Sequence, residues 1–300
     1  MGLLDGKVAI VTGAGRGIGR GHALLLAAQG ARVVVNDLGT GMAGDGRDTT
    51  AAQAVVDEIV AAGGEAVAST DDVATWDGAQ RLVAAAIDTF GTLDVLVNNA
   101  GVLRDAMSFN MTEAEWDTVI DVHLKGHFAP CHHAVRYWRE RGKAGEPVSG
   151  RIINTASESG LYGQAGQANY AAAKAGNRRD DDRDRTRDEE VRRDRERHLP
   201  ACAHAHDRLG ARCGRLHERA RVGPEQIAPV VGFLASDAAA DVSGQVFVVW
   251  GTRVHLMQGW TMVATLDRGE GRWTPEELVA RKDELFAVRS SKIPPMGFGL

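Results

Sequence analysis

Apolar residues along the first 176 positions form short runs that alternate with segments of helical spacing. Runs rich in valine, isoleucine and alanine predict strands at 7–12, 31–37, 65–70, 93–101 and 150–157. Helical spacing predicts helices at 17–30, 49–64, 77–91 and 112–140. The strands are apolar along their whole length, as is typical of strands covered on both faces. The alternation therefore predicts an α/β fold with a doubly wound parallel sheet.

The alternation resumes with a helical segment at 223–236 and an apolar strand-like run at 244–251. Further on, Thr274 is followed by a proline, which is typical of an N-cap and the first position of a helix. We therefore expect a single domain over residues 1–300, with 252–300 as a C-terminal tail that carries a surface helix.

Between 177 and 222 the alternation fails. Residues 178–198 contain nine arginines, six aspartates and three glutamates. They show neither a period of 3.6 nor one of 2, and no β-branched run predicts a strand. Charge runs usually form solvated helix faces or disordered tails, and neither fits between two helices of a compact core.

Composition excludes several classes of function. The net charge of −5 and the lack of a basic face argue against nucleic acid as the partner. No stretch of about 18 apolar residues predicts a membrane span, and neither terminus carries a secretory, peroxisomal or prenylation signal. The three cysteines, Cys131, Cys202 and Cys213, have no framework spacing, so we expect a cytoplasmic protein.

The segment Thr12–Gly19, "TGAGRGIG", follows the first strand and opens the first helix. Glycines here permit a tight turn and let the backbone approach a pyrophosphate at the helix N-terminus. Asp37 ends the second strand about 20 residues further on, where a carboxylate accepts from ribose hydroxyls and repels a 2′-phosphate. These features favour NAD over NADP, although Arg16 could reach such a phosphate and Asp37 could be an ordinary strand-end acid.

Tyr170 and Lys174 are four residues apart and share one face of a helix. An ammonium beside a phenol favours the phenolate, which can act as a base in alcohol oxidation or, protonated, as an acid in carbonyl reduction. A tyrosine and a lysine at this spacing are more often surface residues. Together with the upstream glycine turn they indicate an oxidoreductase.

These motifs resemble those of the short-chain dehydrogenase/reductase family. The resemblance rests on "TGAGRGIG", "NNAG" at 98–101, "YAAAK" at 170–174 and Ser157, thirteen residues before Tyr170. It implies that Ser157 holds the substrate oxygen, Tyr170 transfers the proton, and Lys174 tunes the tyrosine and binds the nicotinamide ribose. Ser159 is the alternative to Ser157, but its spacing is two residues short.

The resemblance also implies a set of residues around the cofactor, with Asp72 and Val73 beside the adenine and the "NNAG" segment along the cleft. The set comprises Thr12, Gly13, Arg16, Gly17, Ile18, Gly19, Asp37, Asp72, Val73, Asn98, Asn99, Ala100, Gly101, Tyr170 and Lys174. Where the family often has an asparagine that relays protons to the lysine, this chain has His123. We count His123 as a catalytic candidate that acts through water, against the alternative of a packed or solvated histidine.

Within the family, "VVVNDLGTGMAGDG" and "GLYGQAGQANYAAAK" are similar to the (3R)-hydroxyacyl-CoA dehydrogenase domain of multifunctional β-oxidation enzymes, which is related to 17β-hydroxysteroid dehydrogenase type 4. This implies an NAD-dependent, stand-alone enzyme acting on an acyl thioester with a secondary alcohol, assembled as a dimer or tetramer. The alternatives are an NADPH-dependent 3-oxoacyl thioester reductase and an inactive pseudoenzyme. A metal site at Cys202, His204 and His206 lacks a fourth ligand, so no metal is expected.

The charged segment has an explanation at the level of codons. Arginine and aspartate codons shifted by one base encode alanine, valine, methionine, threonine and isoleucine. Shifting Asn177 to Asp207 in this way permits an apolar helix, a strand and an Asn-x-x-x-Pro turn, in the family's order. We hypothesise two compensating frame slips, near Gly176–Asn177 and before Gly223, with a natural insertion as the alternative. As written, the segment is expected to deprive the fold of its dimer-forming helix and one buried strand.

Overall fold

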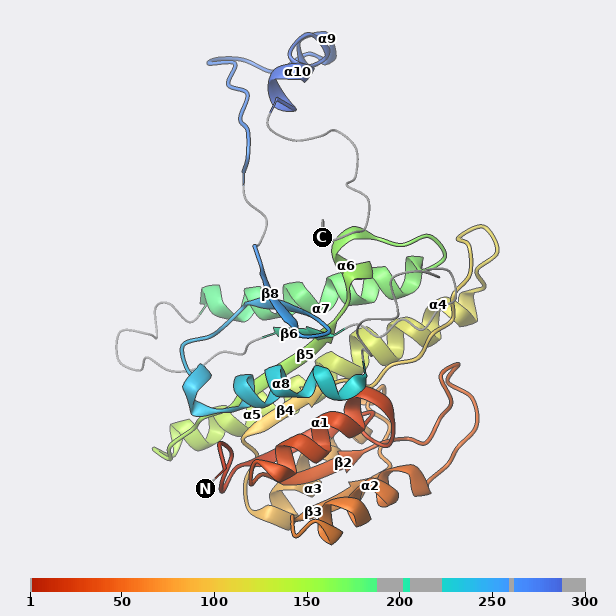
Figure 1. The fold of residues 1–300 in the computed structure, drawn as a ribbon. Helices are drawn as coiled ribbons and strands as arrows, with labels where there is room; N and C mark the ends of the chain where they lie inside the picture. Colours follow the sequence, from red (N-terminus) through yellow and green to blue (C-terminus); the bar gives the residue numbers. More distant parts are fainter. Residues whose placement is uncertain (1, 188–201, 206–222, 259–261, 288–300) are drawn as a thin grey trace. The chain divides into compact units, whose positions relative to one another are not determined.

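The computed structural model describes residues 2–187, 202–205, 223–258 and 262–287 (Figure 1). The chain divides into two compact units, Met1–Met257 and Gln258–Leu300. Within the described residues, the first unit contains one eight-stranded sheet with helices on both faces. The predicted doubly wound α/β fold is therefore confirmed.

The sheet has the strand order β3-β2-β1-β4-β5-β6-β7-β8. Every neighbouring pair is parallel except β7 with β8, which is antiparallel. The strands are β1 (Val8–Thr12), β2 (Arg32–Asn36), β3 (Ala66–Ser69), β4 (Val95–Asn98), β5 (Arg151–Ala156), β6 (Cys202–Ala205), β7 (Val246–Trp250) and β8 (Arg253–Met257). The order reverses between β1 and β4, so the carboxyl ends of these two strands form the crevice where such sheets bind ligands.

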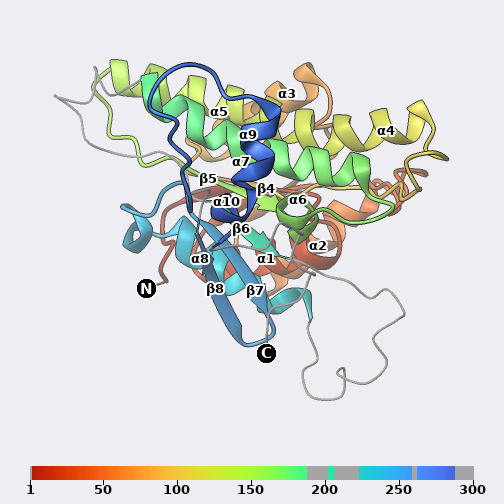
Figure 2. The same ribbon diagram turned by 90° about the horizontal axis from the view of Figure 1, so that it is seen from above.

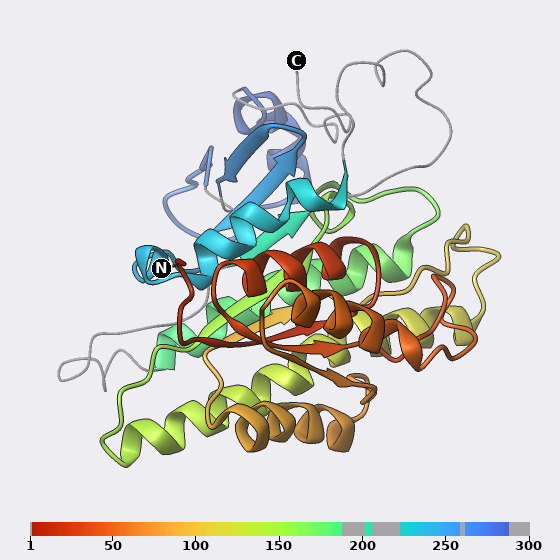
Figure 3. The ribbon, with the colours of Figure 1, turned by 60° about the horizontal axis from the view of Figure 1, so that its bottom comes forward.

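Two layers of helices cover the sheet, as Figures 2 and 3 show. One face carries α1 (Gly17–Ala28), α2 (Thr50–Ala61) and α8 (Ala228–Ala235), and the other carries α3 (Trp76–Phe90), α5 (Gly126–Lys143) and α7 (Ala168–Arg187). Residues of β1 alternate between the two cores: Ala9 and Val11 pack in the first, Val8 and Ile10 in the second. The alternation follows from the two-residue period of a strand.

The long helix predicted at 112–140 is present, but it is not uniform. It consists of α4 (Glu113–Ile120), a π-helical turn at Asp121–Lys125, and α5. Thr112 and Glu115 form a capping box at its start. The extra residue of a π-turn shifts the helical register, and such turns are frequent at functional sites. Here the turn contains His123, which is buried.

The expectation that the sheet lacks a strand beside β5 is wrong, because β6 fills the place between β5 and β7. Two neighbouring strand edges present backbone donors and acceptors, and any uncharged segment can satisfy them with its own backbone. Residues 202–205 belong to the first uncharged stretch after 178–198. The helix before it, α7, continues to Arg187.

Much of the segment hypothesised to be out of frame lies outside the described residues, at 188–201 and 206–222. The frame slip therefore stays a prediction. The metal alternative also falls partly outside, since His206 is not among the described residues. Within the described ranges, no group of three or more His, Cys, Asp or Glu side chains could hold a metal ion.

The predicted tail contains both a strand and helices. β8 pairs with β7, so the beginning of 252–300 belongs to the first unit. In the second unit, a capping box of Thr274 and Glu277 starts the predicted surface helix, which consists of α9 (Pro275–Ala280) and α10 (Lys282–Leu285). Among the described helices, none has both the length and the hydropathy of a transmembrane segment.

The frame hypothesis predicts two compensating single-base displacements in the DNA across codons 170–225. The gene should be sequenced from an independent clone, and the intact mass of the expressed protein should be measured. A DNA sequence and an intact mass that both agree with the printed 32.0 kDa chain would exclude a sequencing error and leave a real lesion. A compact, protease-resistant and active protein of that mass would instead make the charged segment a natural insertion.

Candidate active site

A threonine hydroxyl joins the glycine turn to the end of β4. Thr12 Oγ1 accepts hydrogen bonds from the backbone N–H groups of Asn99, at 2.9 Å, and Ala100, at 3.0 Å. In return, Asn99 Nδ2 donates to the carbonyl oxygens of Thr12 and Gly13, at 3.0 and 3.1 Å. The segments expected to flank a dinucleotide are thus held together at the carboxyl ends of β1 and β4.

The glycines of the turn are required by close backbone packing. A Cβ atom on Gly13, whose φ is +62°, would lie 2.7 Å from the Ala100 Cα, and one on Gly19 would lie 2.1 Å from the Gly13 oxygen. Ile18, between Gly17 and Gly19, packs against the core shared by α1, α2 and α8. Any side chain at Gly13 or Gly19 would therefore push the turn away from β4.

The N-terminus of α1 is open to an anion. α1 begins at Gly17, and its N-cap, Arg16, makes no side-chain capping bond. The first N–H groups of a helix have no intrahelical acceptor and carry the positive end of the helix dipole. A Cβ on Gly17 would meet nothing within 4 Å, so the backbone here can be approached closely.

Asp37 follows β2 and faces the glycine turn. Its Oδ2 accepts from the Gly15 N–H at 2.8 Å, and its Oδ1 accepts from the Gly39 N–H at 2.7 Å. These two bonds fix the carboxylate beside the turn, where the resemblance implies an adenosine ribose. Arg16, the residue that could favour a 2′-phosphate, instead pairs with Asp48.

The remaining predicted cofactor residues have different environments. Asp72 Oδ1 accepts from the Ala74 N–H at 2.9 Å in the turn before α3, and Val73 is buried. Asn98 is fully buried, with Nδ2 donating to Asn154 Oδ1 at 2.8 Å, so its side chain joins β4 to β5. In this segment it is Asn99, not Asn98, that contacts the glycine turn.

Lys174 is buried, with 2% of its surface exposed. Its Nζ donates to the carbonyl oxygen of Thr155, at the end of β5, at 2.5 Å. Burial lowers the pKa of Lys174 from its usual value of 10.5 to about 7. The Nζ lies 5.8 Å from the centre of the Tyr170 ring, so the predicted pair on α7 is close in space.

His123 packs edge-on against Tyr170, with ring centres 4.9 Å apart and planes at 90°. Its Nε2 lies 2.7 Å from the Val102 oxygen and 3.0 Å from the Val102 nitrogen. The shorter contact favours the tautomer in which Nε2–H donates to the carbonyl, which leaves Nδ1 as an acceptor. Nδ1 is buried and has no hydrogen-bond partner among the described residues. Gly101 is needed here too, because a Cβ would lie 2.3 Å from His123 Cε1.

Two residues that sequence analysis missed support the π-turn. Asn177 Nδ2 donates to the His123 carbonyl oxygen at 2.8 Å and lies 2.9 Å from His127 Nδ1. Burial, and secondarily the charge of Lys174, lower the pKa values of His123 and His127 well below the usual range. Both imidazoles are therefore neutral at physiological pH.

Ser157 caps α6 (Glu158–Tyr162), and its Oγ accepts from the Ser159 N–H at 3.2 Å. The hydroxyl of Ser159 donates to Gln167 Oε1 at 2.8 Å, and Gln167 Nε2 donates to Asp105 Oδ2 at 2.8 Å. The Ser159 hydroxyl is thus used within the protein, which favours Ser157 as the serine that meets substrate. Gln167 ties the segment after β4 to the segment before α7.

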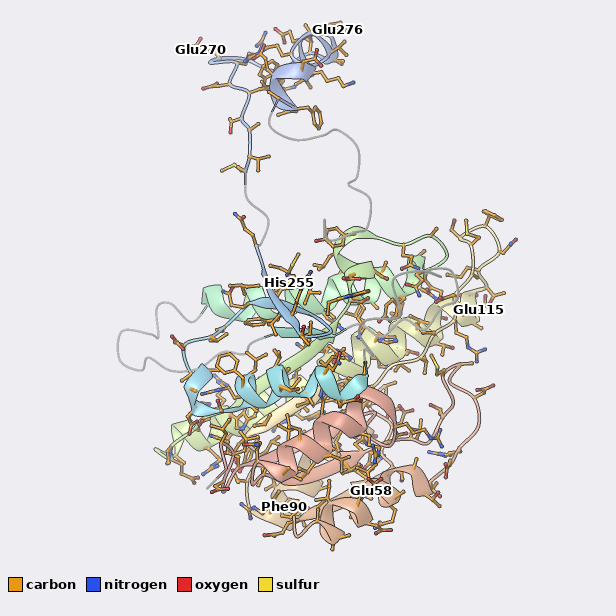
Figure 4. The ribbon with its side chains drawn as sticks, in the orientation of Figure 1. Glu58, Phe90, Glu115, His255, Glu270 and Glu276 are labelled. Carbon is orange, nitrogen blue, oxygen red and sulfur yellow. The ribbon has the colours of Figure 1, made fainter. Side chains whose placement is uncertain are left out.

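Sequence signals for the missed residues were weak. Asn169 Nδ2 donates to the carbonyl oxygens of Arg104 and Glu115, and so joins α7 to the start of α4, where Glu115 is labelled in Figure 4. Gln167 and Asn169 lie within "GQANYAAAK", close enough to Tyr170 to have been candidates. Asn177 and Asp48 had no local pattern that pointed to the site, because His123, the partner of Asn177, and Arg16, the ion-pair partner of Asp48, are distant in sequence.

The residues present fit a nicotinamide dinucleotide. The uncapped N-terminus of α1, the open backbone at Gly17 and the fixed carboxylate of Asp37 offer what a pyrophosphate and a ribose require. At the other end of the cleft, Lys174 has ammonium protons beyond the one that Thr155 accepts.

Known proteins resemble the chain over this site. The short chain dehydrogenase family matches residues 7–179. The hydroxyacyl-CoA dehydrogenase ChsB1 of Mycobacterium tuberculosis is 41% identical and aligns over 95% of this chain and 90% of its own. The peroxisomal multifunctional enzyme type 2 of Drosophila melanogaster is 52% identical over an alignment that covers 57% of this chain and 27% of that enzyme.

A solved structure agrees in fold. The crystal structure of a short chain dehydrogenase from Mycobacterium avium has a TM-score of 0.84 and 46% identity, and the match covers 99% of this chain and all of that one. The family match over more than half of the chain and the full-length relative lead to one conclusion: this protein is an oxidoreductase of the short-chain dehydrogenase/reductase family.

Proposed function

We propose that this chain is an NAD-dependent dehydrogenase that oxidises the secondary alcohol of a 3-hydroxyacyl thioester, or reduces the matching ketone. Its relatives are named as a hydroxyacyl-CoA dehydrogenase and a peroxisomal multifunctional enzyme. The observation that carries the proposal is the closeness of Tyr170 to two buried groups, with Lys174 Nζ 5.8 Å and the His123 ring centre 4.9 Å from the centre of its ring. Ser157 caps α6, which packs against the same helix, α7.

Proton transfer is assigned to Tyr170. During oxidation the hydroxyl proton of the substrate passes to the Tyr170 oxygen, and during reduction it returns along the same path. When bound, the nicotinamide dinucleotide supplies the acceptor for the hydride that leaves the carbinol carbon. Lys174 stabilises the phenolate by its charge, and it donates to Thr155, which fixes the position of its ammonium group.

Ser157 and His123 complete the proposed set of catalytic residues. The Ser157 hydroxyl accepts from Ser159 and keeps its own proton to donate to the substrate oxygen. His123 offers a buried acceptor, Nδ1, beside Tyr170. A water molecule there would connect the imidazole to Lys174 and replace the proton that Tyr170 gives up.

NAD is the proposed cofactor because Asp37 is held beside the glycine turn with its negative charge toward the ribose position. The rival function, a 3-oxoacyl thioester reductase running on NADPH, would need a site that tolerates a 2′-phosphate. An inactive pseudoenzyme is the other rival, and it rests on the segment 177–222. Cytoplasmic location and a dimer or tetramer belong to the same proposal, the first because the cysteines show no disulfide pattern.

Replacing Asp37 tests the cofactor assignment. Asp37→Ala should weaken NAD binding by about 10- to 100-fold, because a hydrogen bond to a charged group contributes about 1.5–3 kcal/mol. It should also reduce the preference of the chain for NAD over NADP. Titration calorimetry with both dinucleotides measures the change. Equal affinities of the unaltered chain for NAD and NADP would contradict the assignment.

Removing one phenolic oxygen tests the catalytic assignment. Tyr170→Phe should lower kcat by about 10²- to 10⁴-fold, the usual contribution of a general acid or base, and leave NAD binding intact. Lys174→Ala should reduce both turnover and binding. Steady-state kinetics with 3-hydroxyacyl-CoA and calorimetry with NAD separate these effects. The assignment fails if Tyr170→Phe retains most of the activity, and an unaltered chain that binds NAD without turnover would favour the pseudoenzyme.

The lowered pKa of Lys174 makes cofactor binding depend on protons. Because the free enzyme holds this pKa at about 7, most of the amine is neutral at pH 8. Ribose hydroxyl oxygens accept from the ammonium and raise its pKa, so NADH binding at pH 8 should take up protons. The uptake should vanish near pH 5.5, where Lys174 is already protonated.

Calorimetry in buffers of different ionisation enthalpy measures this uptake directly. Lys174→Met should abolish it. The matched control is Lys125→Met, since Lys125 is half exposed and its ion pair is with Asp121 at 3.6 Å. Identical proton uptake by the unaltered chain and Lys174→Met would show that Lys174 does not contact the cofactor.

A further inference from the structure

The glycine turn contains one charged side chain, Arg16, and that side chain is already paired. Arg16 Nη2 lies 2.5 Å from Asp48 Oδ2. Arg16 stands between Gly15, whose N–H bonds to Asp37, and Gly17, which begins α1. Its guanidinium is therefore attached at the place where the ribose and the pyrophosphate of a dinucleotide would meet the protein.

Asp48 is held in position by contacts that do not involve Arg16. Its Oδ1 accepts from Thr50, from the hydroxyl at 2.6 Å and from the N–H at 3.1 Å. The Asp48 N–H donates to the Gly39 oxygen at 2.7 Å, and the Gly39 N–H donates to Asp37. The loop between β2 and α2 thus closes on itself, with Asp37 at one end and Asp48 at the other. The pKa of Asp48 is lowered, first of all by the Thr50 bonds, so the carboxylate is charged at neutral pH.

We propose that Asp48 is a positioning residue for cofactor selectivity, which holds Arg16 in an ion pair and so withholds it from a 2′-phosphate. The proposal rests on the proposed NAD-dependent function. A guanidinium is the side chain best suited to bind phosphate oxygens, with two parallel hydrogen bonds. With Asp48 in place, Asp37, Asp48 and Arg16 together carry one net negative charge, which repels a phosphate. Without the Asp48 charge, the Arg16 guanidinium is free to bind a phosphate, and Arg16 and Asp37 together carry no net charge.

The pair contributes little to folding, which makes it a clean target. Both side chains are about half exposed, at 58% and 45%, and exposed ion pairs stabilise proteins weakly. A second exposed pair on the next turn of α1 provides a matched control, because Arg20 bonds to Glu58 of α2, labelled in Figure 4. Breaking that pair changes the local charge to the same extent but leaves Arg16 held.

The test compares dinucleotide affinities of full-length variants by titration calorimetry. Asp48→Asn keeps an oxygen for Thr50 and removes the charge that holds Arg16. In an Asp37→Ala background, it should raise the affinity for NADP relative to NAD by about tenfold, the size of one charge-assisted hydrogen bond. The gain should be lost when Arg16→Ala is added and should shrink at 0.5 M salt. Glu58→Gln in the same background should leave the ratio unchanged.

Two small probes remove any contribution from the catalytic residues. Adenosine 2′,5′-bisphosphate and adenosine 5′-monophosphate differ only in the 2′-phosphate, so Asp48→Asn should improve binding of the first alone. An unchanged ratio with Asp48→Asn, or a gain that survives Arg16→Ala, would overturn the proposal. Failure of the proposed NAD dependence would give a different result, because the unaltered chain would then bind NADP as tightly as NAD.

Discussion

The site depends on a hydroxyl that joins the ends of two parallel strands. Thr12 Oγ1 accepts from two successive N–H groups after β4, and Asn99 returns two bonds to the backbone after β1. Parallel strands leave their polar ends on the same edge of the sheet, and these bonds hold the segments after β1 and β4 together beyond the last strand pair, Val11 with Val97. The contact of Gly13 with Ala100 and that of Gly101 with His123 both rely on this joint. The cofactor turn and the catalytic helices therefore share one support.

Burial sets the charge states of Lys174 and of the two histidines near it. Removing an ammonium from water costs several kcal/mol, and at Lys174 the chain compensates with the Thr155 carbonyl and with easier loss of the proton. Burial of the imidazoles themselves, and secondarily the charge of Lys174, lowers the pKa values of His123 and His127 and keeps both neutral. Neutral imidazoles can accept a proton, as a relay requires. Burial thus leaves Lys174 able to lose its proton near neutral pH and leaves both imidazoles in the neutral form.

Most of the fold could be predicted because its strands and helices depend on residues that are close in sequence. Contacts between residues that are distant in sequence could not be predicted. Continuous apolar strands, helical spacing and the glycine turn depend on neighbours in sequence, so the sheet, its covering helices and the Tyr170–Lys174 pair could be read directly. The π-turn at His123 leaves no periodicity that differs from an α-helix. The Arg16–Asp48 pair joins residues 32 apart, and the Asn177–His123 bond joins residues 54 apart. The strand β6 was missed because its place is set by the gap between β5 and β7, not by its own side chains.

Asn177 lies where the family match ends and the charged segment begins. Its amide group bonds inside the core to the His123 oxygen and to His127, and the family match continues to residue 179. The first hypothesised frame slip, near Gly176–Asn177, begins at this point of the chain and stays a prediction. Beyond that point α7 and β6 keep backbone hydrogen bonds, which are the same for every residue except proline. A change of reading frame can therefore preserve the backbone pairing of a helix and a strand while it replaces their side chains, so contacts made by side chains are what such a change alters.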